Sequence, residues 1–298
     1  MSRLVFAKQR LTRAEHCYVT CPGYRDGVGA QLHARLSTML YAERLGLCYA
    51  HTPFSILAHA PKTDPHWPAK WERFLGLGVG ETAAFEIARQ LGPPRPVTNP
   101  TQIRVAENTF WSVPNAHLYA NLFPRGYERL TAGWAARYAA APKDGCVAHY
   151  TEGAINVAVH MRRGDVTSER NACRYTADDY IATLLDQVTA VLRGSGVRSV
   201  VRMFSQGEEQ DFASLRRFDL EFHLEEDLFT TFHSLVQADV LVMAKSCFSC
   251  SAALLARGIK IYEPTGHQPL AGWVVADVSG RIDKGRLSRA LFQQRAAR

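Results

Sequence analysis

The second half of the chain alternates between two hydrophobic periods. Short apolar, β-branched runs predict strands at residues 155–161, 199–204, 220–224, 240–243 and 259–262. Between these runs apolar residues recur every three or four positions, which predicts helices at residues 176–193, 209–218, 228–237 and 248–257. Thr176 is placed to cap the first of these helices, while Gly194 and Gly258 are placed to end helices. Strands separated by helices predict a parallel, doubly wound sheet, with ligands bound beyond the carboxyl ends of its strands.

The first half is less regular. Residues 17–21 predict a strand that runs into a turn with several glycines, and residues 30–45 predict a helix with one apolar face. Proline-rich stretches at residues 59–68 and 92–100 interrupt the pattern after this helix. The fold class that the whole chain predicts is α/β.

The segment at residues 139–145 predicts a connector between two domains. We expect an N-terminal α/β domain over residues 1–145, on the acceptor side of the ligand site, and a C-terminal Rossmann-like domain over residues 146–298. The chain ends in a basic, weakly amphipathic segment from Asp283. Packing as a helix against the protein is the expected role of this segment, ahead of peripheral membrane contact.

Composition narrows the class of protein. The chain has 298 residues, of which 47% are hydrophobic and 21% are charged, so it can bury a full core and is not a disordered chain. Lysine and arginine outnumber aspartate and glutamate by 35 to 28, and the net charge of +7 favours an anionic partner. The first residues lack the apolar core of a signal peptide, and no segment approaches the roughly 20 apolar residues of a membrane span. We therefore expect a cytoplasmic protein without a membrane span.

Cysteine spacing indicates neither a zinc finger nor a disulfide framework. The cysteines are Cys17, Cys21, Cys48, Cys146, Cys173, Cys247 and Cys250. They include no two paired CxxC units and no histidines at finger spacing, so a structural zinc site is not expected. Cys247 and Cys250 form a lone CxxC that lacks the context of a redox motif.

The run His160-Met161-Arg162-Arg163-Gly164-Asp165 stands at the carboxyl end of a predicted strand. Because side chains alternate along a strand, His160 and Arg162 point the same way, and the turn after the strand frees Arg163 and Asp165. Two guanidinium groups at a strand end suit phosphate oxygens. The alternative is a solvent-exposed basic turn in which Asp165 pairs with an arginine.

Two further segments carry candidate chemistry. The predicted strand after Gln237-Ala238-Asp239 ends in Lys245-Ser246-Cys247-Phe248-Ser249 and opens a helix, so backbone N–H groups there form an anion site unless Ser246 is simply an N-cap. The run Gly27-Val28-Gly29-Ala30-Gln31-Leu32-His33 has glycines that allow close approach of a ligand, or a plain tight turn. A full dinucleotide fingerprint is absent.

In this order, the three segments resemble motifs of the fucosyltransferases that use GDP-fucose. These comprise the core α1,6-fucosyltransferases, the rhizobial nodulation fucosyltransferases and, more distantly, the α1,2- and protein O-fucosyltransferases. Their motifs are a Gly-x-Gly-x-Gln-Leu-His-like loop, a His-x-Arg-Arg-x-Asp motif, and a late Gln-Ala-Asp followed by a Ser-rich turn. The resemblance implies a GT-B-like architecture of two Rossmann-like domains, with the GDP-sugar donor held mainly by the C-terminal one.

The resemblance also implies site residues. It assigns Arg162 to the donor β-phosphate, His160 to the nucleotide, and Ser246 or Cys247 to the phosphate-binding serine of the family. Other donor-binding residues that it implies are Arg163, Gly27, Gly29, Gln31, His33, Phe248 and Ser249. Glu169 is the nearest match to the acid that activates the acceptor, one residue short of the family's spacing, and it completes a catalytic set with Arg162 and Asp165.

Two positions depart from the α1,6 enzymes. Val166 replaces a lysine, and Thr231 replaces an aspartate thought to recognise guanine. The nucleobase is therefore expected to contact Ser205, Gln206 or Glu208 instead. Acceptor recognition is expected in the first half. Candidates that stack on sugars or simply fill the core are Trp67, Trp71, Trp111 and His117.

The residue types fit a mechanism on their own. Displacement of GDP builds negative charge on the diphosphate, which guanidinium groups and a helix N-terminus stabilise. A carboxylate such as Glu169 would take the proton of the attacking hydroxyl and give inversion. The chain contains no Asp-x-Asp, and residues 225–227 read as acidic charges at a helix start, so neither a metal nor another cofactor is expected.

The sequence thus predicts an inverting fucosyltransferase whose partners are a GDP-sugar donor and a glycan acceptor. Two alternatives stay open: a transferase that uses another GDP-sugar, since phosphate-binding residues do not read the sugar, and a non-catalytic protein that binds nucleotide sugars or glycans. Nucleic-acid binding rests on the basic charge alone, without an aromatic and basic module, and is not expected.

Overall fold

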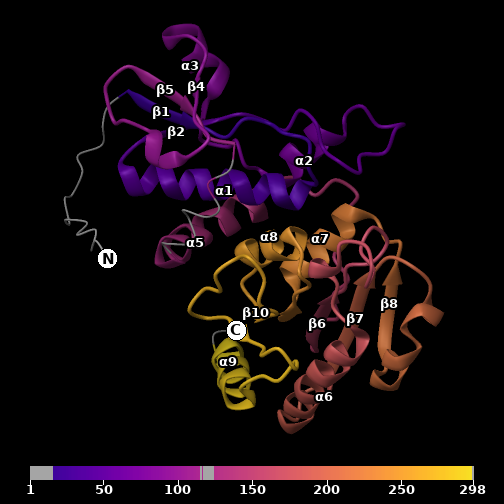
Figure 1. The fold of residues 1–298 in the computed structure, drawn as a ribbon. Helices are drawn as coiled ribbons and strands as arrows, with labels where there is room; N and C mark the ends of the chain where they lie inside the picture. The colour runs from indigo at the N-terminus through magenta and orange to yellow at the C-terminus, as the bar shows by residue number, and fades with distance from the viewer. Residues whose placement is uncertain (1–15, 115, 117–123, 297–298) are drawn as a thin grey trace.

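The computed structural model describes residues 16–114, 116 and 124–296 and contains two parallel sheets (Figure 1). The first sheet has the strand order β3-β2-β1-β5-β4. Its strands are β1 (Cys17–Thr20), β2 (Cys48–His51), β3 (Thr82–Ala83), β4 (Arg95–Pro96) and β5 (Thr109–Ser112). The helices of this half are α1 (Val28–Leu45), α2 (Trp67–Leu75), α3 (Ala84–Leu91) and a 3-10 turn at Pro100–Gln102.

The second sheet has the strand order β11-β10-β9-β6-β7-β8, again with every pairing parallel. Its strands are β6 (Ile155–His160), β7 (Ser199–Ser205), β8 (Leu220–Leu224), β9 (Val240–Val242), β10 (Ile259–Tyr262) and β11 (Val274–Val275). The helices around it are α5 (Pro124–Ala140), α6 (Asp178–Gly194), α7 (Leu228–Gln237), α8 (Cys247–Leu255) and α9 (Lys284–Ala296). The predicted α/β class, with a doubly wound parallel sheet in the C-terminal half, is confirmed.

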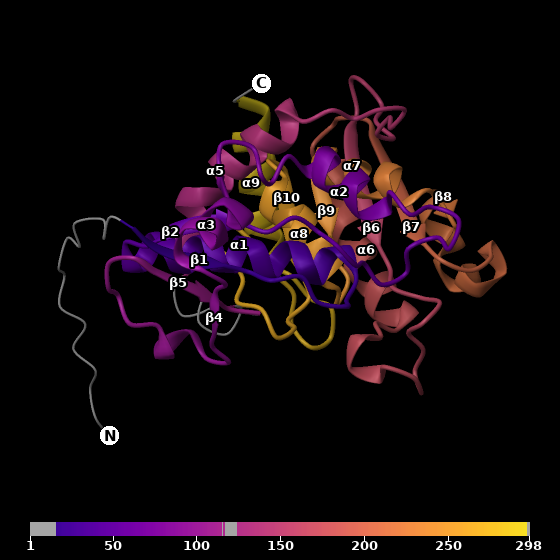
Figure 2. The same cartoon turned by 90° about the horizontal axis from the view of Figure 1, so that it is seen from above.

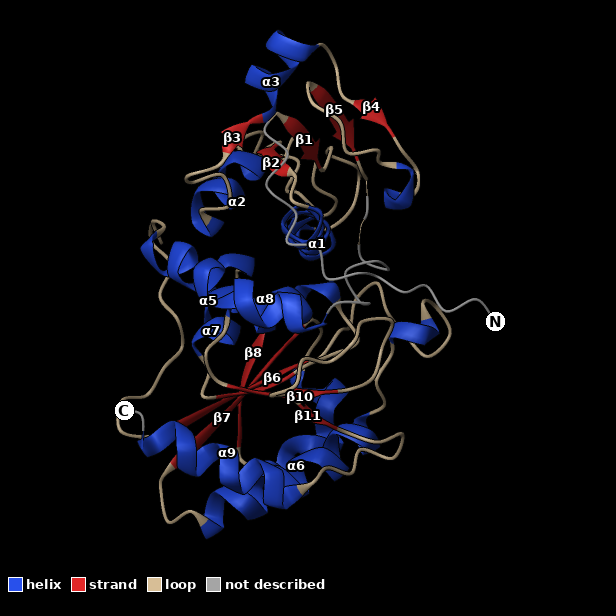
Figure 3. Cartoon of the chain, turned by 90° about the vertical axis from the view of Figure 1, so that its left-hand side faces the viewer, coloured by secondary structure: helices blue, strands red, loops and turns tan. Residues whose placement is uncertain are grey.

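Helices cover both faces of the second sheet, with α6 and α9 on one face and α5, α7 and α8 on the other (Figure 3). Strand β6 is buried along its whole length because it lies between these layers. Val157 and Val159 pack toward α6, whereas Ala158 belongs to the core on the opposite face. This explains why Val157, Ala158 and Val159 follow one another in β6 without a polar residue between them.

A single core joins the two halves of the chain. Leu32 and Leu36 of α1 belong to the same buried cluster as Trp71 of α2, Phe232 of α7 and Leu254 of α8. Helix α1 lies along α8, as two perpendicular views show (Figures 1 and 2). The N-termini of α1 and α8 therefore meet between the two sheets.

Several local predictions need correction. The segment Glu209–Phe218 is 3-10 helix with a kink at Phe212, rather than α-helix. Thr176 does not cap α6, since its hydroxyl donates to the Glu263 carboxylate at 2.5 Å and the N-cap is Ala177. Strand β11 was not predicted, because its two residues are too few to show a hydrophobic period.

The basic C-terminal segment folds as α9 and packs against α6. Its buried side chains are Leu287 and Leu291, each worth about 1.5–3 kcal/mol when fully buried. The packing role predicted for this segment is confirmed. The domain boundary at residue 145 stays a prediction; it falls after α5, in the segment that leads to β6.

Candidate functional site

A cavity of about 680 Å³ lies where the two halves of the chain face each other. Its walls come from the ends of β6, β7 and β8 and from the N-termini of α1 and α8. This is the carboxyl edge of the second sheet, where doubly wound folds bind ligands. The volume lies within the range of about 300–1,000 Å³ that is typical of small-molecule sites.

Arg162 lines the cavity directly after β6 and holds Asp165 in a two-pronged ion pair. Its Nε donates to Oδ1 at 3.0 Å and its Nη2 donates to Oδ2 at 2.6 Å. These bonds hold the pKa of Asp165 below its usual range. Nη1 of Arg162 forms no hydrogen bond with the described residues, so this nitrogen remains available to a ligand.

Arg163 also borders the cavity, but its guanidinium group is anchored. It donates to Asp178 at 2.6 Å and to the Thr176 carbonyl at 3.0 Å, and it stacks over the Tyr175 ring. The expectation that the turn frees Arg163 and Asp165 is therefore wrong, because each has a close ionic partner. Arg163 fixes the turn to the start of α6, while Arg162 faces the cavity.

His160 is buried at the end of β6 and also lines the cavity. Burial, reinforced by the charge of Arg162, lowers its pKa to about 3, so the ring is neutral. Among the described residues, Nδ1 has no hydrogen-bond partner. A neutral, buried ring nitrogen without a partner is the kind of group that a bound ligand satisfies.

Helix α8 begins at the cavity wall. Ser246 is its N-cap, with Oγ accepting from the Phe248 amide at 3.2 Å, so the capping interpretation of this serine is confirmed. Ser246, Cys247 and Phe248 all line the cavity. The positive end of the α8 dipole is thus directed at the ligand space. Ser249 is fully buried and donates to the carbonyls of Ala244 and Ser246 at 3.2 and 3.3 Å, so it supports this turn from behind.

The glycines of the first motif have different surroundings. Gly27 and Gly29 both line the cavity. A Cβ built on Gly27 would meet nothing closer than His59 at 3.9 Å, whereas one on Gly29 would lie 2.5 Å from the backbone of Phe248. Gly29 is therefore required for the contact of α1 with α8, and Ser251 reinforces that contact by donating to the Gly29 carbonyl at 2.8 Å.

Gln31 and His33 lie beneath the cavity and do not line it. Gln31 is fully buried and donates to the carbonyls of Asp26 and Ile56, so it holds the loop before α1 to the segment after β2. His33 is also buried and lies near the ring of His267, with a centroid separation of 4.2 Å.

Glu169 is not brought to the cavity. Its side chain is exposed in the loop after β6. That loop folds back on itself, since Arg170 donates to the carbonyls of Gly164 and Asp165, and Asn171 donates to Asp165. The role of Glu169 as acceptor base stays a prediction without geometric support.

Ser205 and Gln206 line the cavity at the end of β7, while Glu208 does not. Gly164 has a φ of 74° and lies against Gln206, where a Cβ would come within 2.5 Å of its Oε1. The glycine in the arginine-containing turn thus serves both the left-handed backbone and the neighbouring strand end.

Further lining residues had no role assigned from the sequence. Lys245 pairs with Glu263 at 2.7 Å, Arg174 is exposed and forms no ion pair with the described residues, and Asp26 precedes α1. Glu225 and Glu226 follow β8. Along the sheet edge, cations therefore cluster beside β6 and β9, and carboxylates lie beside β8. Lys245 belongs to the motif that precedes α8, whereas only the basic composition indicated Arg174.

The aromatic residues that are predicted to recognise the acceptor lie in different parts of the fold. Trp67 lines the cavity and Trp71 is fully buried in the core, stacked on Phe229. Trp111 lies in the first sheet beside Arg95, away from the cavity, and His117 falls outside the described residues. Among the residues that the structure describes, no helix has the length and apolar character needed to cross a bilayer.

Neither the family models nor the curated proteins provide a match to this chain. Solved structures resemble it in fold. POFUT1 in complex with GDP is 13% identical, with coverage of 83% of this chain and 97% of that chain and a TM-score of 0.42. Fucosyltransferase NodZ from Bradyrhizobium is 13% identical, with coverage of 90% and 98% and a TM-score of 0.38. E. coli heptosyltransferase WaaC with ADP-2-deoxy-2-fluoro heptose is 13% identical, with coverage of 94% and 99% and a TM-score of 0.39.

Proposed function

We propose that the protein is an inverting glycosyltransferase that transfers fucose from GDP-fucose to a glycan hydroxyl. The observation that carries this proposal is the meeting of three motifs at one cavity. Gly27 and Gly29, Arg162, and the turn at residues 246–248 are far apart in sequence, yet all line it. These are the segments whose order resembles the GDP-fucose enzymes.

The diphosphate of the donor is assigned to the cationic part of the cavity. Arg162 supplies a guanidinium group with Nη1 available, α8 supplies its N-terminal dipole, and Arg174 supplies a further charge. As the bond to the sugar breaks, negative charge grows on the β-phosphate, and these fixed groups stabilise it without solvent reorganisation. The neutral His160 ring offers its partnerless Nδ1 to the nucleotide.

The nucleobase is assigned to the part of the cavity beside β7 and β8. Phe204 and Leu228 offer apolar surface there, and Glu225 and Glu226 offer carboxylates. The Watson–Crick edge of guanine presents two adjacent N–H donors, which a carboxylate accepts as a pair, whereas adenine and uracil lack this arrangement. Thr231, which replaces the family's aspartate, lines the same part of the cavity.

The acceptor hydroxyl needs a base on the side of the sugar opposite to the departing diphosphate. Glu169 was selected by motif spacing, but it is exposed outside the cavity. We favour Asp26, the carboxylate that the first half of the chain contributes to the wall. Its Oδ1 accepts from the Gly27 amide at 2.7 Å, and Oδ2 forms no hydrogen bond with the described residues. Attack of the hydroxyl on the anomeric carbon from that side, with departure of GDP, would invert the configuration, and Asp26 would take the proton of the hydroxyl.

Protein cations take the place of a divalent ion at the diphosphate in this mechanism. We therefore expect added magnesium or manganese to leave the turnover number unchanged. Asp165 supports this arrangement, because Arg162 engages its carboxylate and it belongs to neither group of possible metal ligands among the described residues.

A transfer assay tests the proposal. The full chain is incubated with GDP-fucose and a panel of oligosaccharides, and mass spectrometry follows both GDP release and the gain of one deoxyhexose by an acceptor. We expect a fucosylated product whose anomeric configuration is opposite to that of the donor. A product with GDP-mannose but not with GDP-fucose would assign another sugar, and binding without any transfer would assign a non-catalytic role.

A further inference from the structure

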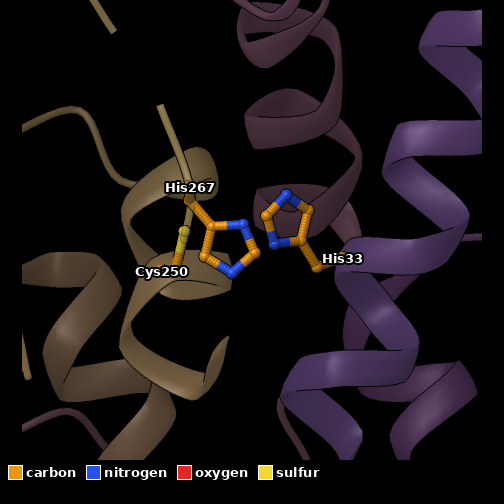
Figure 4. A group of neighbouring side chains, drawn as sticks. All are labelled: His33, Cys250 and His267. Carbon is orange, nitrogen blue, oxygen red and sulfur yellow. The ribbon is translucent and has the colours of Figure 1, made fainter. Parts of the chain in front are cut away.

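Three side chains from three separate segments gather beside the cavity, and one of them, His267, lines it. His33 comes from α1, Cys250 from α8, and His267 from the loop between β10 and β11 (Figure 4). One nitrogen of each histidine and the Cys250 sulfur all lie within 4.8 Å of one another. Two imidazoles and a sulfur converging in this way form the core of a site for a borderline-soft metal ion.

A fourth donor stands one helical turn away. Cys247 precedes Cys250 by three residues, so both sulfurs lie on one side of α8. The Cys247 sulfur is 3.6 Å from Nε2 of His267, which is close to the separation of neighbouring ligands around a tetrahedral zinc ion. The lone CxxC of the sequence therefore meets two histidines that only the fold brings to it.

Partners outside the cluster hold the His33 ring and the loop that carries His267. The Tyr127 hydroxyl lies 3.3 Å from Nε2 of His33, and it is bonded in turn to Ser37 at 2.6 Å. The loop that carries His267 is fixed by Tyr262, whose hydroxyl donates to the His267 carbonyl at 2.6 Å. Such supporting contacts orient metal ligands and restrict their rotation.

The charges of the ligand set can balance a divalent ion. A bound divalent ion would replace one proton on each sulfur and release two protons to solvent. The resulting pair of thiolates balances the two charges of the ion.

We propose that His33, Cys247, Cys250 and His267 bind one zinc ion between the two halves of the chain. The ion links α1 to α8 and to the loop after β10, just behind the N-terminus of α8. Its role is structural, since it fixes the geometry of the two helices that border the cavity. The proposal does not depend on which donor the cavity takes.

His149, His223 and Glu226 form a second group of possible metal ligands, but their contacts with one another account for this arrangement without an ion. His149 and His223 both contact the same carboxylate oxygen of Glu226, at 3.0 and 3.3 Å. These contacts satisfy that oxygen without an ion, and Arg202 adds a positive charge that opposes a cation there. His149 is therefore a useful control position, because its loss removes that group and leaves the proposed site intact.

The test uses the untagged full chain, purified without chelators. Elemental analysis is expected to give about one zinc per chain. Cobalt substitution is expected to produce the near-ultraviolet charge-transfer absorption of thiolate ligands. Cys250→Ser and His267→Gln should each lose the bound zinc, whereas Cys48→Ser and His149→Gln should retain it. Circular dichroism identifies variants that fail to fold. If a variant does not fold, the test uses the wild-type chain instead: a chelator removes its metal, zinc is titrated back, and thermal unfolding measures the change in melting temperature.

The proposal is overturned if the wild-type chain holds no zinc and zinc leaves its melting temperature unchanged. Retention of zinc by Cys250→Ser, or its loss from His149→Gln, would also overturn it by assigning the ion elsewhere. An unchanged cobalt spectrum in Cys247→Ser would remove Cys247 from the ligand set. None of these readouts involves transfer activity, so the outcome is separate from that of the proposed function.

Discussion

Gly29 and Phe248 bring the N-termini of α1 and α8 into backbone contact. A Cβ on Gly29 would lie 2.5 Å from both the amide nitrogen and Cα of Phe248, closer than a real Cβ approaches. The two helix starts therefore border one cavity from opposite halves of the chain. The contact couples the packing of the halves to the shape of the ligand space.

Gly29→Ala is expected to destabilise the protein, because the added methyl group must push α1 away from α8. Overpacking of this kind costs about 1–3 kcal/mol, and the free energy of unfolding measured in urea should fall by that amount. Gly27→Ala is the matched control, since its nearest neighbour would be 3.9 Å away. Equal stability of the two variants would contradict the contact.

Arg162→Ala is expected to weaken GDP binding by about 10- to 100-fold, which corresponds to the loss of charge-assisted hydrogen bonds worth about 1.5–3 kcal/mol. The variant also leaves the Asp165 carboxylate without its partner beside the phosphates. Calorimetric titration with GDP measures the change. Arg217→Ala serves as the control, because that exposed arginine pairs with Asp186. Unaltered GDP affinity in Arg162→Ala would remove Arg162 from the donor site.

Acidification is expected to destabilise the fold partly through His160. The folded pKa is about 3 and the ordinary value is 6.5, so between these values the unfolded chain binds a proton that the folded chain excludes. Stability is then lost as pH falls below 6.5, by up to about 1.4 kcal/mol per pH unit for this group. Urea unfolding at pH 7.5, 6 and 5 should give a shallower pH dependence for His160→Gln than for the wild type. Identical slopes would mean that His160 is not buried in neutral form.

Asp26→Asn is expected to lower the turnover number at least 100-fold, the scale of general base catalysis, while GDP affinity changes little. Glu169→Gln should have nearly wild-type turnover, because its side chain is exposed outside the cavity. Rates with saturating donor and acceptor, together with GDP titration, separate the two roles. The reverse pattern would return the base to Glu169.

Most of the C-terminal fold was predictable because its longer strands and its α-helices each follow one simple hydrophobic period. Residues 155–160 and 259–262 are rich in isoleucine and valine, and they form the strands β6 and β10. Elements fixed by tertiary contacts were harder to predict. Thr176 looks like a cap but bonds to Glu263, which is distant in sequence, and the short strands of the first sheet carry too few residues for a periodic signal.

The residues of the cavity were likewise predictable where a local sequence signal marks them, and not where tertiary contacts decide their position. Arg162 and Ser246 were found because motif and strand end coincide. Glu169 was selected by spacing alone, and spacing cannot report that Arg170 and Asn171 fold the loop back on Asp165. His267 carries no local motif, and its meeting with Cys247 depends on the loop after β10.

Calorimetric titration of the wild-type chain with GDP-fucose, GDP, UDP and ADP tests the central claim most directly. If the cavity holds a guanine nucleotide sugar, GDP and GDP-fucose will bind with a stoichiometry near one, and UDP and ADP will bind at least tenfold more weakly. Equal affinity for all three diphosphates, or no binding of GDP-fucose, would contradict the assignment of this cavity to a GDP-sugar.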